Sequence, residues 1–138
     1  MNKWWTSPTA NYLSNLTFGN NTFLTVGNYG TILTSSDNGT TWDNRTSGTT
    51  NYLVGVTYGN STFVTVGYSG TILTSSDNGT TWTSRTSGTT NLLEGVTYGN
   101  STFVTVGESG TILTSSDGTT WTSRTSGTTN NVWGVTYK

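Results

Sequence analysis

Short stretches of apolar and β-branched residues, separated by Gly and Asn, follow one another along the chain. In the middle of the sequence four of them are Leu53–Gly59, Thr62–Tyr68, Thr71–Asp77 and Trp82–Ser87. Thr, Val and aromatic residues favour strands, and Gly and Asn favour turns. The connections Asn-Ser, Ser-Gly and Asn-Gly-Thr-Thr are short enough for antiparallel hairpins. The pattern predicts an all-β sheet of four antiparallel strands, here named a to d in chain order.

The four-strand pattern occurs three times, in repeats 11–50, 51–90 and 91–129, and the second and third repeats differ at three aligned positions and one deleted Asn. Four hairpin-linked strands in each repeat of about 40 residues are typical of β-propeller blades. Residues 1–10 match strand d and residues 130–138 match strand a, which predicts an extra outer strand and an extra inner strand. A stacked β-solenoid is the alternative, but solenoid turns are usually shorter and their strands pair in parallel. We therefore treat residues 1–138 as one repeat domain of three complete propeller blades.

The strand composition also indicates how the blades assemble. Strands b and c carry apolar residues on both faces, as expected for a sheet between two neighbouring blades, and Gly55, Gly59 and Gly67 allow close approach of backbones. Closed propellers typically have four to eight blades, so three cannot close a ring. Bare sheet edges and blade faces favour association. The sequence predicts a homo-oligomer that completes the ring, with a dimer of six full blades favoured and strand exchange as the favoured role of the extra strands.

One acidic turn motif occurs three times: SSDNGTTW at Ser35–Trp42 and Ser75–Trp82, and the shortened SSDGTTW at Ser115–Trp121. An Asp at a hairpin corner can accept hydrogen bonds from following backbone N–H groups, Gly supplies a left-handed conformation, and Trp buries a large ring. Three equivalent carboxylates indicate architecture rather than catalysis, with altered hydrogen bonding in the shortened third turn. The residues given this structural role are Ser35, Asp37, Gly39, Trp42, Ser75, Asp77, Gly79, Trp82, Ser115, Asp117, Gly118 and Trp121.

The first two turns fit Ser-x-Asp-x-Gly-x-x-Trp, which resembles the Asp-box of the bacterial-neuraminidase (BNR) repeat. The surrounding G-T-I-L-T-S-S-D-N-G-T-T-W, with V-G-x-x-G ahead of it, looks more like the photosystem II assembly-factor branch of that superfamily. The resemblance covers nearly the whole chain and implies a β-propeller. It leaves function open, because such blades serve sialidases, sorting receptors, assembly factors and secreted binding proteins. Calcium is the alternative role for the turns, but one carboxylate per turn is too few for the oxygen ligands calcium takes, so no metal or cofactor is expected.

Composition narrows the function classes. Only 8% of the residues are charged and the formal net charge is -1, which leaves no basic surface for nucleic acid or an anionic membrane. The chain has no His and no Cys, which removes disulfides, thiol catalysis and the usual general base near neutral pH. The compartment is not named by the sequence; a secreted or periplasmic location is favoured.

The resemblance makes sialidase activity the first enzyme function to consider. Sialidases hold the substrate carboxylate with three converging arginines. Here the arginines are Arg45, Arg85 and Arg124. They occupy the same place in the outermost strand of each repeat, so they cannot converge on one carboxylate. Among the acids only Glu94 and Glu108 could meet as a carboxyl pair of the kind glycosidases use. The sequence predicts a protein that is not an enzyme, with a degenerate glycosidase as a minor alternative.

The differences between the repeats fall in the d–a and b–c connections, which share one face of a propeller. The candidate ligand-binding residues on that face are Tyr12, Asn28, Tyr29, Tyr52, Tyr68, Glu94, Glu108 and Trp133. Loops of this kind commonly carry function on rigid scaffolds. The sequence favours a recognition module that binds a protein segment or a carbohydrate, as a lectin does, on this face. The alternative is a purely structural amplified or designed repeat, which the near identity of repeats two and three supports.

Overall fold

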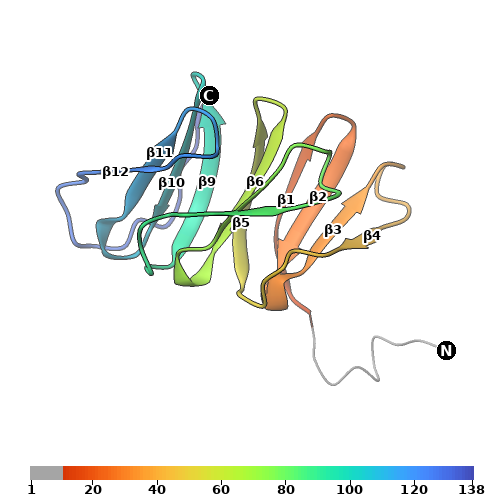
Figure 1. Ribbon diagram of the computed structural model, residues 1–138, viewed down its shortest axis with the longest axis horizontal. Helices are drawn as coiled ribbons and strands as arrows, with labels where there is room; N and C mark the ends of the chain where they lie inside the picture. The colour runs from red at the N-terminus through yellow and green to blue at the C-terminus, as the bar shows by residue number, and fades with distance from the viewer. Residues whose placement is uncertain (1–10) are drawn as a thin grey trace.

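The computed structural model describes residues 11–138 and contains three four-stranded antiparallel sheets standing side by side (Figure 1). In each sheet the strand order follows the chain, and each sheet corresponds to one repeat. Blade 1 comprises β1 (Leu13–Gly19), β2 (Thr22–Gly27), β3 (Ile32–Ser35) and β4 (Asp43–Arg45). Blade 2 comprises β5 (Leu53–Gly59), β6 (Thr62–Gly67), β7 (Ile72–Ser75) and β8 (Thr83–Arg85). Blade 3 comprises β9 (Leu93–Gly99), β10 (Thr102–Gly107), β11 (Ile112–Ser115) and β12 (Thr122–Arg124).

The predicted all-β fold of four-stranded antiparallel blades is confirmed, with the inner strands matching best. Strand a of the middle repeat was expected over Leu53–Gly59, and β5 has these bounds. The other strands are shorter than expected, because residues given to their ends belong to turns. Tyr68 starts a short 3₁₀ turn, Tyr68–Gly70, and Asp77 lies beyond the end of β7 in the acidic turn. The equivalent 3₁₀ turns in blades 1 and 3 are Asn28–Gly30 and Glu108–Gly110.

The hydrophobic core lies between blades. One cluster joins Leu24, Val26 and Ile32 of blade 1 to residues of blade 2, among them Phe63. A second cluster repeats this arrangement between blades 2 and 3, with Phe103 in the place of Phe63. Each blade therefore buries its apolar residues mainly against the next blade, as the apolar pattern of strands b and c predicted.

Glycines allow the close approach that these interfaces need. A Cβ at Gly59 would lie 2.1 Å from Cγ of Tyr98 in the next blade, and a Cβ at Gly55 would lie 3.1 Å from Cα of Gly95. A Cβ at Gly67 would meet the carbonyl oxygen of Tyr52 at 2.0 Å. The expected close approach of backbones is confirmed at Gly55, between blades 2 and 3, and at Gly67, within blade 2. At Gly59 the side chain of Tyr98, not its backbone, lies against the glycine.

The two expected extra strands have different outcomes. The outer strand proposed for residues 1–10 lies outside the described residues. Residues 131–138, here called the C-terminal segment, form no strand, because no strand b lies beside them within the described chain. Their position is nevertheless that of strand a of a further blade, since a Cβ at Gly99 would lie 2.0 Å from Cγ of Tyr137 as Gly59 does from Tyr98. Ring closure by oligomerisation and the division into repeats remain predictions.

Candidate functional site

The acidic turns are held by a fixed set of hydrogen bonds. In the first turn Ser35 donates to Asp37 Oδ1 at 2.8 Å and accepts from the Gly39 N–H at 2.9 Å. The Thr41 N–H and hydroxyl both donate to the Asp37 carboxylate. Gly39 has φ +82, so it takes the left-handed conformation expected from its place in the motif. The second turn repeats these contacts around Asp77.

The third turn has the altered hydrogen bonding that its deletion predicted. Asp117 Oδ1 accepts from the Thr119 N–H at 2.8 Å and from the Thr120 N–H at 2.9 Å, two and three residues on instead of four. Gly118, directly after the carboxylate, takes the left-handed conformation at φ +76. The missing Asn therefore moves the backbone donors closer to the carboxylate in sequence while the turn stays closed.

The tryptophans of the three turns differ in burial. In each turn the indole N–H donates to the glycine carbonyl, at 3.0 Å from Trp42, 2.9 Å from Trp82 and 2.9 Å from Trp121. Trp82 and Trp121 are half-buried against the cores between blades. The prediction that Trp42 buries its ring is wrong, because its side chain is 38% exposed. Within the described chain no blade precedes blade 1, so Trp42 lacks the core between blades against which Trp82 and Trp121 pack.

Hydrogen bonding sets the charge state of the turns. The donors from Thr41 and Ser35 lower the pKa of Asp37 from 3.8 to about 2, and those from Thr81 and Ser75 lower the pKa of Asp77 from 3.8 to about 2. Backbone N–H groups of Thr120 and Thr119 lower the pKa of Asp117. Each turn is therefore stabilised by an ionised carboxylate that accepts several hydrogen bonds.

This arrangement predicts acid sensitivity. A carboxyl whose pKa is lower in the folded than in the unfolded protein contributes stability above its unfolded pKa, and that contribution is lost as pH falls through the folded pKa. We expect the urea midpoint to fall between about pH 4 and about pH 2. Replacing the three turn carboxylates by Asn should flatten this fall. Both proteins should carry Glu94→Gln, because burial and the neighbouring Glu108 raise the pKa of Glu94 and give the opposite dependence. Equal falls in both proteins would contradict the assignment.

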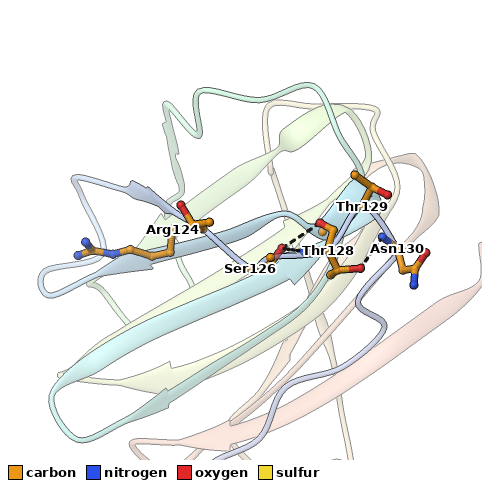
Figure 2. A pocket seen from close by; sticks show the side chains of 8 residues that line it. Arg124, Ser126, Thr128, Thr129 and Asn130 are labelled. Atoms are coloured by element: carbon orange, nitrogen blue, oxygen red, sulfur yellow. Dashed lines mark hydrogen bonds between the residues drawn. The ribbon is translucent and has the colours of Figure 1, made fainter.

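The d–a and b–c connections meet on one face, as expected, and form three equivalent hollows. The hollow of blade 1 is lined by Tyr29 and Gly30 of the 3₁₀ turn together with Arg45 and residues 46–50. Those of blades 2 and 3 contain Gly70 and Gly110 with the same Thr-Ser-Gly-Thr-Thr loop, 86–90 and 125–129. Figure 2 shows the hollow of blade 3, where Ser126 and Thr128 are joined by hydrogen bonds and the guanidinium of Arg124 is directed away from them. The hollows are lined mainly by Thr, Ser and Gly, so hydroxyl and backbone groups lie beside the methyl groups of the threonines.

The arginines stay apart, in agreement with the sequence interpretation. Arg45, Arg85 and Arg124 each donate from Nε to a Thr hydroxyl of strand c in their own blade, at 2.9, 2.9 and 2.8 Å. Arg45 also pairs with Asp43 at 3.6 Å. Each arginine is therefore tied to its own blade, and the three do not form the shared carboxylate clamp that a sialidase uses.

The variable residues of the candidate face come in pairs that join the b–c turn to the start of strand a. Asn28 Oδ1 accepts from the Tyr12 N–H at 2.8 Å, and Glu108 Oε2 accepts from the Leu92 N–H at 3.2 Å. In blade 2 the rings of Tyr52 and Tyr68 stack with centroids 5.3 Å apart. Asn28 and Glu108 thus hold the local backbone.

Aromatic side chains remain exposed on this face. Tyr12 is 65% exposed, Tyr29 58%, Tyr68 46% and Trp133 69%. Trp133 lies close to the 3₁₀ turn of blade 3, because the neighbouring Asn131 Oδ1 accepts from the Ser109 N–H at 3.0 Å. The structure therefore brings the candidate aromatics to the same end of the three blades.

Glu94 and Glu108 form the acidic part of the face. Burial raises the pKa of Glu94, and the charge of Glu108 raises it further, so the two carboxyl groups interact as the sequence suggested. Among residues 11–138, no cluster of three or more Asp, Glu, His or Cys side chains is arranged so that it could hold a metal ion. None of the helical turns within the described chain is long and apolar enough to span a membrane.

The hollows were not predicted from the sequence, because the candidate residues lie where the repeats differ. Their lining is nearly invariant: the segment Arg-Thr-Ser-Gly-Thr-Thr occurs at 45–50, 85–90 and 124–129. An identical polar loop after every strand d was the available indication.

Comparisons with known proteins bear on the fold. No family model matches the chain, and no curated protein matches it. Among solved structures, YCF48 bound to D1 peptide has a TM-score of 0.71 at 21% identity, covering 84% of this chain and 40% of that one. YCF48 from Cyanidioschyzon merolae has a TM-score of 0.70 at 24% identity, covering 85% of this chain and 38% of that one. The chain thus spans about 40% of the length of these neighbours. The likeness supports the propeller fold that the resemblance implied; the Asp-box assignment stays a prediction.

Proposed function

We propose that the chain is a non-catalytic recognition module that binds an extended protein segment across the d–a/b–c face. The observation that carries this proposal is the gathering of four exposed aromatic side chains, Tyr12, Tyr29, Tyr68 and Trp133, at one end of the blades. Exposed aromatic groups on a rigid scaffold are typical anchors of interaction surfaces. The hollows beside them offer hydroxyl and backbone groups to a peptide main chain.

The charge of the face indicates what the segment carries. Blade 3 places Glu94 and Glu108 close enough that the charge of Glu108 adds to burial in raising the pKa of Glu94. A Lys or Arg of the ligand at this end would relieve their repulsion. Apolar or proline side chains fit the tyrosines of blades 1 and 2, since aromatic faces bury such groups well. The expected ligand is therefore a peptide with an apolar part and a basic residue. The fold neighbour bound to D1 peptide shows that a protein of this fold can hold a peptide.

Binding can be tested with synthetic peptides. One series combines proline and aliphatic residues with a single Lys, and a matched series carries Glu in its place; calorimetric titration measures affinity. We expect the Lys series to bind and the Glu series to bind about tenfold more weakly or not at all. Tyr68→Ala and Trp133→Ala should each weaken binding by about tenfold, as loss of an aromatic anchor does. Trp42→Ala is the control, because Trp42 belongs to an acidic turn away from this face.

Three outcomes would count against the peptide proposal. Binding that does not change in Tyr68→Ala and Trp133→Ala would place the site elsewhere. Binding of glycans on an array, lost in the same variants, would support the lectin alternative. No binding by either ligand class would favour the purely structural repeat.

A further inference from the structure

Blade 1 exposes side chains that the other blades bury. Leu16 is 54% exposed and Phe18 53%, whereas Val56 and Val96, at the position of Leu16, are 5% and 9% exposed. Trp42 is more exposed than its equivalents Trp82 and Trp121. We call the surface formed by Leu13, Leu16, Phe18 and Trp42 the open face of blade 1.

The two internal interfaces show what covers this surface. In blade 2 the equivalent residues pack against Leu24, Val26 and Ile32 of the preceding blade, and in blade 3 against Val64, Val66 and Ile72. Blade 3 carries the same three positions as Val104, Val106 and Ile112. Val104 and Ile112 are only half-buried, whereas Val64 and Ile72 are fully buried. The chain therefore presents both halves of one interface, at opposite ends of its row of blades.

We propose that the open face of blade 1 binds blade 3 of a second copy of the chain, head to tail. The contact is continuous with the established interfaces, because it would add a third member to a row already formed by blades 1–2 and 2–3. Both halves are apolar, and the same pairing of residues already forms a buried core twice within the chain. A head-to-tail contact of this kind gives a ring where it closes and a filament where it does not.

Polar groups at the edge fix the register. At the interface of blades 1 and 2, Asn78 of the second acidic turn donates to Thr22 Oγ1 at 2.8 Å and accepts from Asn20 Nδ2 at 3.1 Å. Asn38 is the same residue of the first turn, and it is exposed on blade 1. Asn100 and Thr102 of blade 3 occupy the positions of Asn20 and Thr22. In the proposed contact Asn38 meets Asn100 and Thr102 of the second copy.

The C-terminal segment competes for the same place on blade 3. Tyr137 lies against Gly99 as Tyr58 lies against Gly19 and Tyr98 against Gly59. Phe18 is the equivalent of these tyrosines in repeat 1, so Phe18 of a second copy needs the place that Tyr137 fills. The segment forms no strand and is held by two hydrogen bonds: the Val132 N–H donates to the Gly107 carbonyl at 2.9 Å, and Asn131 Oδ1 accepts from the Ser109 N–H at 3.0 Å. It acts as a weak internal competitor at high effective concentration.

Self-association of the chain tests the proposal. Sedimentation over a micromolar range would compare the full chain with a chain that lacks residues 131–138. We expect truncation to tighten association by about tenfold or more, because it removes the internal competitor. Phe18→Asp should abolish association in both forms. The measurement contains no peptide, so it reports self-association whether or not the d–a/b–c face binds one. Displacement of residues 131–138 by a second copy would also move Trp133, so peptide affinity is measured on the full chain at concentrations where it is a monomer.

Cross-linking keeps the test independent of truncation. The chain contains no cysteine, so single variants Asn38→Cys and Asn100→Cys can be mixed and treated with a short bismaleimide. We expect covalent dimers from the mixture and few from either variant alone, because a head-to-tail contact joins different positions. The double variant Asn20→Cys/Asn78→Cys is the matched control: it should cross-link within one chain and report on folding, since these side chains are 3.1 Å apart at their hydrogen-bonded atoms.

Each result of the sedimentation and cross-linking experiments either supports or contradicts the proposed contact. A particle of fixed mass and a mass that rises with concentration both support the contact, as a ring and a filament respectively. Monomers at all concentrations in both chain lengths, or cross-links no more frequent in the mixture than in the single variants, overturn it. Association that appears only when residues 1–10 are deleted also overturns it, because that segment would then be the occupant of the open face.

Discussion

Gly59→Ala is expected to destabilise the protein by about 3 kcal/mol or more, although it adds a single methyl group. The new Cβ would lie 2.1 Å from Cγ and 2.2 Å from Cδ2 of Tyr98. The ring of Tyr98 has little room to retreat, because it packs on Phe103 with centroids 4.5 Å apart and on the core between blades 2 and 3. Blades 2 and 3 must therefore separate or the strand must distort. Urea unfolding monitored by tryptophan fluorescence measures the loss.

Two other glycines serve as matched controls. Gly134→Ala adds the same methyl group where no atom lies within 4 Å, and it should change stability little. Gly99→Ala makes the same clash as Gly59→Ala, but with Tyr137 of the C-terminal segment, which forms no strand and can move aside. Its cost should fall between the other two. Equal effects of all three substitutions would show that close packing of tyrosine on glycine does not hold the blades together.

Sequence patterns predicted the inner strands well, because there the alternation of side chains and the position of the hairpin turn both indicate the same strand end. Leu53–Gly59 alternates in the manner of a strand and ends in a hairpin turn, and β5 has these bounds. The outer strand was expected over Trp82–Ser87, but β8 covers only Thr83–Arg85. Trp82 belongs to the turn through its indole hydrogen bond to Gly79, and Ser87 belongs to the loop that lines a hollow. Side-chain hydrogen bonds of this kind leave no trace in the alternation of apolar and polar residues.

The sequence predicted only part of the candidate site, again because side-chain hydrogen bonds cannot be recognised in the sequence pattern. Variation between repeats predicted that the candidate aromatic residues lie at one end of the blades, as they do, but it could not identify the side chains that hold a loop. Asn28 and Glu108 vary and yet accept hydrogen bonds from backbone N–H groups of their own blade. Trp42 shows the reverse difficulty. Trp42 and Trp82 lie in the same sequence motif, but the burial of each ring depends on whether another blade precedes its own. The motif alone cannot predict that.

Phe63→Ala is expected to cost about 3 to 5 kcal/mol, since it leaves a cavity in the core between blades 1 and 2. Phe63 is fully buried, and Tyr58 packs on it with ring centroids 4.6 Å apart. No polar group or main-chain conformation changes with the substitution, so the loss measures packing between blades. Thermal and urea unfolding of the single variant, compared with the parent chain, give its size.

Phe23→Ala is the matched control, because Phe23 occupies the same position in blade 1 and is only half-buried. In a monomer its cost should be clearly below that of Phe63→Ala, since less area leaves water when Phe23 folds into place. If a second copy covers the open face, Phe23 becomes as buried as Phe63, and its cost should rise with protein concentration toward the value for Phe63. A cost for Phe23→Ala that equals that of Phe63→Ala in a dilute monomer would contradict the view that neighbouring blades, rather than each blade alone, supply the core.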